Sequence, residues 1–215
     1  HHTMVAPFRG AESRFGTNPI TMAMPTSNPE EPIILDMATS VVAMGKVCVA
    51  NDSGKTVPEE WLIDSEGQPS SDPGVMFNDP LGALQPFAEH KGYALCLMAE
   101  LMSGALSGGG TIQPGNERLD GIINTMTMII MDPHRLGDAN AIAREVDAMV
   151  DYTKSARPAD PEKPVLVPGD PERIARKERG ANGIFIPEGT WVLLLEAGEK
   201  LGLDRSRALE IAGLA

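Results

Sequence analysis

Residues 91–107, KGYALCLMAELMSGALS, constrain the fold most, because they stay almost wholly apolar over about four helical turns. Their Leu and Met side chains do not keep to one stripe, and a helix that is apolar all round is a buried helix. We therefore predict a buried helix that ends at the glycines of SGGG, residues 107–110.

This helix begins with His90, Lys91 and Gly92, which is an unusual start. A helix N-terminus already carries partial positive charge, so a cation there needs a negative partner in front of it. Lys91 suits a phosphate, Gly92 lets a ligand approach the backbone, and the first N–H groups of a helix bind anions. The alternative is a solvated lysine at an exposed helix start. We favour anion binding.

The rest of the pattern predicts a mixed α/β or α+β protein, with a mixed sheet flanked by helices. Strands and helices follow one another without strict βαβ alternation, and 22 Gly and 18 Pro favour many turns over a plain bundle. The predicted strands are 20–24, 33–35, 61–64, 124–131, 165–167 and 184–186. The predicted helices are 39–50, 91–107, 139–156, 170–180, 188–201 and 204–212, although residues 39–50 also fit a strand.

The net charge of the chain limits the classes of partner that we expect it to bind. The 215 residues carry a formal net charge of -12, which argues against nucleic acid and against anionic membrane surfaces. There is no signal peptide pattern and no apolar span of 18 residues, so we expect a cytoplasmic protein without a membrane partner. Cys48 and Cys96 each lie in an apolar run, which predicts two buried, reduced thiols.

The first two residues, His1 and His2, stand where an initiator methionine is expected. They are either the end of a purification tag or a native stretch of a chain that begins mid-sequence.

Three further stretches are candidate binding sites, each with a structural alternative. Asp36 directly follows a predicted apolar strand. A carboxylate at that place either binds a ligand hydroxyl or is a structural residue of a turn. Thr39 or Ser40, a few residues on, is a candidate helix cap. In GTNP, residues 16–19, a turn without a ligand is favoured. In VPGDPE, residues 167–172, the N–H groups of a helix start are one candidate for anion binding. We favour the alternative, in which Asp170 and Glu172 are ordinary acidic residues in the first turn of a helix.

Several well-known motifs are missing from the sequence. No G-x-G-x-x-G follows a strand, no Walker A motif occurs, and no cluster of side chains predicts a metal site. The sequence thus gives no motif support to a Rossmann dinucleotide enzyme. His134 lies in Asp-Pro-His-Arg and is interpreted as a turn residue rather than a catalyst.

Taken together, four stretches resemble one family. GTNPI, IILDMATSVVAMGK, EHKGYALCLMAELMSGALSGG and VPGDPERIARKERG occur here in the order seen in the non-Rossmann malate/L-lactate dehydrogenase family. That family also includes L-sulfolactate and ureidoglycolate dehydrogenases and a piperideine/pyrroline-2-carboxylate reductase. The resemblance runs from about Val5 to the C-terminus.

The resemblance implies an NAD- or NADP-dependent oxidoreductase that acts on a small 2-oxo or 2-hydroxy acid, or on a related cyclic imine. It also implies a homodimer with a nucleotide-binding fold unlike the Rossmann fold. The implied cofactor-binding residues are Asp36, Met37, Ala38, His90, Lys91, Pro168, Gly169 and Asp170. The implied substrate-binding residues are Thr17, Met44 and Gly45.

Two departures from the family pattern affect these positions. Asp170 stands where the family has Glu, and Met44 stands where some relatives have an Arg that pairs with a carboxylate.

A third departure concerns catalysis. Family members carry, ahead of this start, a segment with the His that acts as general acid/base and an Arg that grips the substrate, and no residue here matches either. The resemblance implies no catalytic residue within residues 1–215, which we expect to form one cofactor-binding and dimerisation portion of a larger two- or three-part enzyme fold. The alternatives are a truncated, non-catalytic cofactor-binding relative and a phosphate-metabolite binder that uses Lys91.

Overall fold

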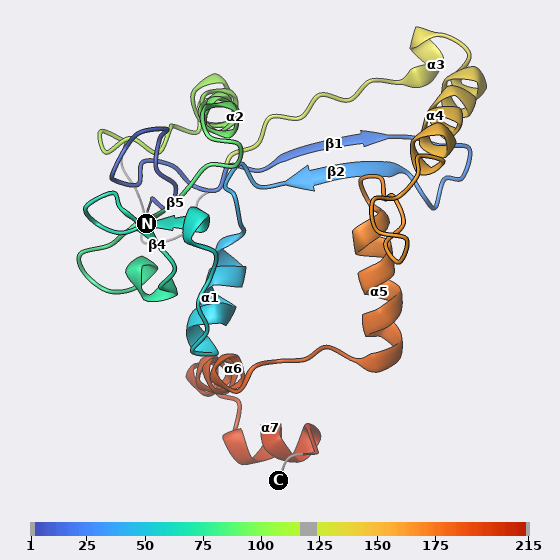
Figure 1. The fold of residues 1–215 in the computed structure, drawn as a ribbon. Coiled ribbons are helices and arrows are strands. Elements are labelled where there is room, and N and C mark those ends of the chain that lie inside the picture. The colour runs from blue at the N-terminus through green and yellow to red at the C-terminus, as the bar shows by residue number, and fades with distance from the viewer. Residues whose placement is uncertain (1–2, 117–123, 214–215) are drawn as a thin grey trace. The chain divides into compact units, whose positions relative to one another are not determined.

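The computed structural model describes residues 3–116 and 124–213, and Figure 1 shows its helices and strands. The described residues divide into two compact units. The first unit comprises the described residues of 18–39 and 94–183, and the second comprises residues 3–17, 40–93 and 184–213. Helix α2, His90–Glu100, begins in the second unit and ends in the first.

The first unit is built on a β-hairpin. Strand β1, Ile20–Met24, pairs antiparallel with β2, Ile33–Met37, so that Ile20 lies opposite Met37. After α2 the chain continues in a π-helical turn, Leu101–Leu106. The remaining helices of this unit are α3 (Pro133–Leu136), α4 (Ala139–Lys154) and α5 (Asp170–Asn182).

Side-chain caps fix the starts of two of these helices. The Asp132 carboxylate accepts a hydrogen bond from the His134 N–H, and the Asp138 carboxylate accepts one from the Asn140 N–H. Such caps satisfy amide groups that lack a partner within the helix. Asp138 thus caps α4, and His134, which was interpreted from the sequence as a turn residue, lies in the short helix α3 instead.

The second unit contains a small antiparallel sheet in the order β4-β3-β5. Its strands are β3 (Leu62–Ile63), β4 (Pro69–Ser70) and β5 (Ala83–Leu84). Its helices are α1 (Met44–Asp52), α6 (Glu188–Lys200), α7 (Arg205–Ile211) and two 3-10 turns, Glu59–Trp61 and Pro73–Met76.

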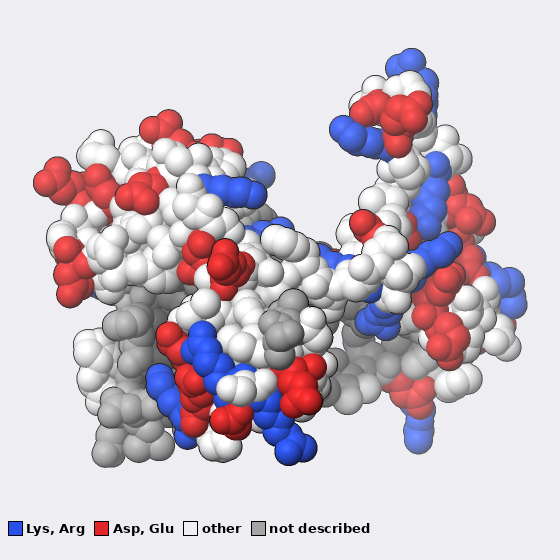
Figure 2. All heavy atoms as spheres, turned by 90° about the horizontal axis from the view of Figure 1, so that it is seen from below, with Lys and Arg blue, Asp and Glu red and all other residues white. Residues whose placement is uncertain are grey.

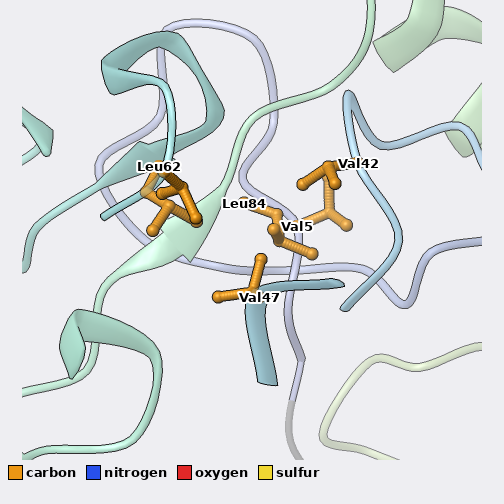
Figure 3. Packing of buried hydrophobic residues seen from close by; sticks show 6 residues of the cluster. Val5, Val42, Val47, Leu62 and Leu84 are labelled. Carbon is orange, nitrogen blue, oxygen red and sulfur yellow. The ribbon is translucent and has the colours of Figure 1, made fainter. Parts of the chain in front are cut away.

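An apolar cluster holds this second unit together. Figure 3 shows side chains from the N-terminal segment, α1 and the sheet meeting in one core. Its members are Val5, Val42, Val47, Val57, Leu62 and Leu84. Each fully buried Leu or Val side chain contributes roughly 1.5–3 kcal/mol, so this cluster is the main source of stability for the unit.

The mixed class of helices and strands is confirmed, and β1, β2, α4, α6 and α7 lie close to their predicted bounds. The helix predicted at 39–50 begins five residues later, at Met44, and Gly45 lies in its first turn. Thr39 and Ser40 do not cap it, because their hydroxyls donate to the carbonyls of Asn18 and Val42 instead.

The strands predicted at 124–131, 165–167 and 184–186 are absent from the described residues, which show no regular secondary structure there. An alternating apolar pattern favours a strand, but a strand forms only when another strand satisfies its backbone groups. No such partner lies beside these segments in the described part of the chain, and Ile130 is 83 % exposed.

Most residues of the helix that was predicted to be buried are exposed or half-buried. Within α2 and the π-helical turn only Gly92, Cys96 and Gly104 are buried, while Met98 and Leu101 are open to solvent. The apolar composition identifies a helix that gains from burial, but the described residues cover only one side of it. Cys96 is buried as predicted, whereas Cys48 is only half-buried.

Opposite charges are interspersed over the face shown in Figure 2, where Lys and Arg lie next to Asp and Glu. None of the helices in the described ranges is long and apolar enough to cross a membrane.

Two glycines near the end of α5 give a test of its boundary. Gly180, the predicted stop, lies inside the helix with open space where a side chain would stand, whereas Gly183 ends it with a φ of 82°. We expect Gly180→Ala to raise the free energy of unfolding by about 0.5–1 kcal/mol. We expect Gly183→Ala to lower it by about 1 kcal/mol. Thermal unfolding followed by circular dichroism compares the two, and a stabilising Gly183→Ala would contradict this boundary.

Candidate functional site

Asp36 lies on the exposed side of β2, one residue before the strand ends. Its Oδ1 atom accepts a hydrogen bond of 2.8 Å from the Thr21 hydroxyl, which lies directly opposite on β1. Among the described residues no second donor reaches this carboxylate, so it retains acceptor capacity toward solvent. Met37 and Ala38, the next two predicted residues, are half-buried behind it.

The Pro168–Asp170 loop enters helix α5 through a left-handed residue, Gly169, with φ 98° and ψ -23°. Asp170 is the first residue of the helix, and its side chain is only 11 % exposed. Its carboxylate accepts from the Val167 N–H at 3.0 Å, pairs with Lys154 at 2.9 Å and pairs with Arg173 at 2.7 Å.

These contacts decide the charge of Asp170. Burial raises the pKa of its carboxyl, but the hydrogen bond from Val167 and those from Lys154 and Arg173 outweigh burial and hold the pKa at about 2. The group is therefore ionised at neutral pH. Both of its oxygen atoms are engaged by the protein.

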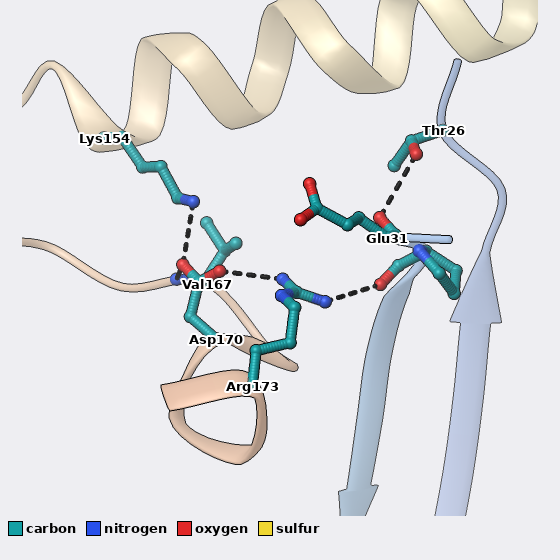
Figure 4. Close-up of polar contacts among 7 residues, drawn as sticks. Thr26, Glu31, Lys154, Val167, Asp170 and Arg173 are labelled. Atoms are coloured by element: carbon teal, nitrogen blue, oxygen red, sulfur yellow. Dashed lines mark hydrogen bonds and ion pairs between the residues drawn. The ribbon is translucent and has the colours of Figure 1, made fainter. Parts of the chain in front are cut away.

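The first unit brings the two predicted cofactor segments together. The Ile34 N–H of β2 donates to the Pro168 carbonyl at 3.4 Å, and Arg173 Nη1 donates to the Pro32 carbonyl at 3.2 Å. A polar cleft of about 430 Å³ lies beside this junction, lined by the 26–33 loop, α4 and the start of α5 (Figure 4). On its rim the Asp147 carboxylate accepts from the Ser27 N–H.

The turn before α2 changes the interpretation of that helix start. Ala88 and Glu89 both have positive φ, 45° and 54°, which costs about 1 kcal/mol or more for each non-glycine residue. This turn lets the carbonyls of residues 87–89 accept hydrogen bonds from the N–H groups of residues 91–93. The prediction of unused amides at residues 91–93 is therefore wrong, and any anion binding there depends on side chains.

Gly92 has a structural role in this turn. A Cβ atom there would lie 2.0 Å from the Phe87 carbonyl oxygen, which approaches the helix closely. The glycine thus accommodates the chain's own backbone, rather than the ligand predicted from the sequence.

The two predicted side chains at this helix start are exposed. The His90 ring lies 5.7 Å from the Phe8 ring, tilted by 60°. No carboxylate in the described parts of the chain lies within ion-pair distance of Lys91. Lys91 is therefore a solvated cation beside the positive end of a helix, where an anionic ligand is favoured.

The predicted substrate-binding residues all belong to the second unit. Thr17 is half-buried, and the Met44 side chain packs against the apolar cluster described above. Gly45 is exposed, with open space where a side chain would stand.

Asn18 is a residue whose importance the sequence did not reveal. Its side-chain Nδ2 donates to the Cys96 carbonyl at 3.0 Å and to Glu100 at 2.9 Å, both on α2. Its own carbonyl accepts from the Thr39 hydroxyl at 3.0 Å. Asn18 thus joins the start of β1 to α2 and to the segment that follows Ala38. The only signal in the sequence was a short amide side chain in the GTNP turn.

Lys154 and Arg173 were also missed, because helix-surface cations are common and their shared partner, Asp170, becomes apparent only from the fold. Among the described residues no group of three or more His, Cys, Asp or Glu side chains is arranged to hold a metal ion.

Comparison with known proteins shows a consistent similarity. A family model described as malate/L-lactate dehydrogenase matches residues 1–195. Hydroxycarboxylate dehydrogenase B of Escherichia coli K12 is 44 % identical over 204 residues, which cover 93 % of this chain and 55 % of that protein. The chain thus spans little more than half the length of this relative.

Solved structures agree with the sequence comparison. An E. coli structure provisionally named a malate/lactate dehydrogenase is 37 % identical, with a TM-score of 0.83 over 99 % of this chain and 59 % of that one. The Δ1-piperideine-2-carboxylate reductase of Pseudomonas syringae pv. tomato is 30 % identical, with a TM-score of 0.66 over 90 % of this chain and 56 % of that one.

The hydrogen bonds of Asn18 can be tested with a change that keeps its shape. Asn18→Asp replaces the donating amide by a carboxylate that faces Glu100 and the Cys96 carbonyl. We expect the free energy of unfolding to fall by about 2 kcal/mol at neutral pH, because two acceptors lose their donor and two carboxylates meet. Asn28→Asp, in an exposed loop, is the matched control. Equal effects of the two changes in denaturant unfolding would exclude this role.

Proposed function

The chain belongs to the malate/L-lactate dehydrogenase family. On this basis we propose that it binds NAD or NADP and forms part of an oxidoreductase. The proposed reaction is hydride transfer between that cofactor and a small 2-hydroxy or 2-oxo acid such as malate or lactate. The main structural support is the junction in the first unit, where the Ile34 N–H reaches the Pro168 carbonyl and joins the two predicted cofactor segments.

The residues present suit a dinucleotide by their chemistry. The exposed Lys91 ammonium suits a phosphate, and the Asp36 carboxylate, held by Thr21, suits a ribose hydroxyl. His90 flanks Lys91, and the Met37–Ala38 pair and the Pro168–Gly169 turn supply backbone beside the ligand. When bound, the nicotinamide ring supplies or accepts the hydride.

Thr17, Met44 and Gly45 are the proposed substrate-binding residues. Met44 packs with an apolar side chain against the core, so it gives a carboxylate no ionic partner. Reduction of a carbonyl also needs a proton donor near the oxygen. We assign that role to none of the described residues, because His134 is exposed in α3 and belongs to no candidate site.

A cyclic-imine 2-carboxylate reductase is the second candidate. The structural likeness to the piperideine-2-carboxylate reductase favours it, because reduction of a C=N bond next to a carboxylate also uses a hydride from a nicotinamide.

A homodimer and a cytoplasmic location are also part of the proposed function. The dimer is supported by the exposed apolar side chains of residues 126–131, since such surfaces mark contacts with other chains.

A substrate panel tests the reaction. Protein made from the full coding sequence is mixed with NADH or NADPH and either 2-oxo acids (oxaloacetate, pyruvate) or cyclic imines (piperideine- and pyrroline-2-carboxylate). We expect oxidation of the nicotinamide with at least one 2-oxo acid. Turnover of the imines alone would support the reductase instead. Cofactor binding without turnover of any compound would indicate a non-catalytic relative.

A second test concerns Lys91. We expect Lys91→Ala to raise the Kd for NADH or NADPH by about tenfold, because a charge-assisted contact to phosphate is lost. Nicotinamide fluorescence titration measures the Kd, and Lys177→Ala, at an exposed lysine of α5, is the control. Unchanged affinity in Lys91→Ala would contradict this assignment. Wild-type protein that binds sugar phosphates but neither dinucleotide would contradict the proposed function itself.

A further inference from the structure

We propose that Arg173 and Lys154 are positioning residues, which act through Asp170 to hold residues 167–170 in the shape that binds the cofactor. This inference rests on the proposed function. It assigns Asp170 a role different from direct contact with the ligand, because both of its carboxylate oxygens are already engaged within the protein.

Arg173 connects the loop to the β-hairpin. Its Nη2 lies 2.7 Å from Asp170 Oδ1, and its Nη1 donates to the Pro32 carbonyl at 3.2 Å (Figure 4). A guanidinium is planar and rigid, so one side chain that makes both contacts fixes the distance between Asp170 and the residue before β2. Strand β2 carries Asp36, so the Arg173 side chain links the Asp36 segment to the loop of residues 167–170.

Lys154 connects the same carboxylate to the last residue of α4. Its ammonium lies 2.9 Å from Asp170 Oδ2, the oxygen that also accepts the Val167 N–H at 3.0 Å. The Val167 amide lies directly before Pro168, so this hydrogen bond closes the loop on itself. The negative charge that Asp170 keeps at neutral pH sustains all three contacts.

The loop and the guanidinium also fit together sterically. Gly169 adopts a left-handed conformation, and a Cβ atom there would lie 2.9 Å from Arg173 Nη1. The Gly169 backbone therefore lies against the Arg173 side chain. Loss of the guanidinium leaves the loop free to sample other conformations, and a ligand must then order it on binding, which weakens affinity.

The test compares two arginines of one helix. Arg173→Met removes the bridge, and Arg176→Met removes an exposed arginine of α5 that makes none of these contacts. The full chain is titrated with NADH and NADPH, with nicotinamide fluorescence as the signal. We expect Arg173→Met to raise the Kd about tenfold, with Arg176→Met within twofold of wild type. Arg173→Lys should recover part of the affinity, because it restores a positive charge beside Asp170 but cannot make both contacts of the guanidinium.

A variant with matched instability separates positioning from general destabilisation. Leu62→Ala opens a cavity in the apolar core of the second unit, whereas residues 167–170 belong to the first unit. If Leu62→Ala, at an equal loss of thermal stability, raises the Kd as much as Arg173→Met, the inference is wrong. If Arg173→Met does not fold, Lys154→Met provides the same comparison, and wild-type affinity in that variant overturns the proposal.

The outcomes distinguish this inference from the function on which it rests. Wild-type protein that binds neither dinucleotide overturns both. Wild-type binding together with unchanged affinity in folded Arg173→Met overturns only the positioning role.

Discussion

The ionised carboxylate of Asp170 is the contact on which the first unit depends most. It gathers a lysine from the end of α4, an arginine from α5 and the backbone amide of Val167, and through the arginine it reaches the residue before β2. Truncating one partner of such a group leaves a poorly solvated charge, which is why partly buried networks matter more than surface ion pairs. The proposed cofactor loop lies within this network.

The two units are stabilised by different kinds of interaction. In the second unit, side chains from several segments form an apolar core around Leu62 and Leu84. In the first unit, the only buried apolar side chains among the described residues are Cys96 and Val167, and the elements are joined mainly by polar contacts. Those contacts are directional, so they fix the geometry of Asn18, Asp36 and Asp170 closely. They contribute less stability than an apolar core of similar size would.

Local patterns predicted elements well where an element's partners are its own residues or the neighbouring segment of the chain. The hairpin strands, the capped start of α4 and the two last helices follow from alternation, caps and periodicity. Prediction failed where the outcome depends on neighbours. Residues 124–131 have a strand pattern but no partner strand among the described residues, and α2 has the composition of a buried helix but is covered on only one side.

At the candidate site, the sequence motifs identified the loops. Asn18, Lys154 and Arg173 could not be identified in this way, because their hydrogen-bond and ion-pair partners include residues that are distant in sequence.

The division of the chain between the units has a consequence for its synthesis. The chain passes from one unit to the other at residues 17–18, 39–40, 93–94 and 183–184. The hairpin of the first unit leaves the ribosome long before α4 and α5, which complete its contacts, and the second unit lacks α6 and α7 until the whole of the first unit has been made. Neither unit is therefore encoded by a continuous stretch of the gene. Domains usually fold as units during synthesis, but here the first unit completes its fold only after α5 has been made, and the second only after α7.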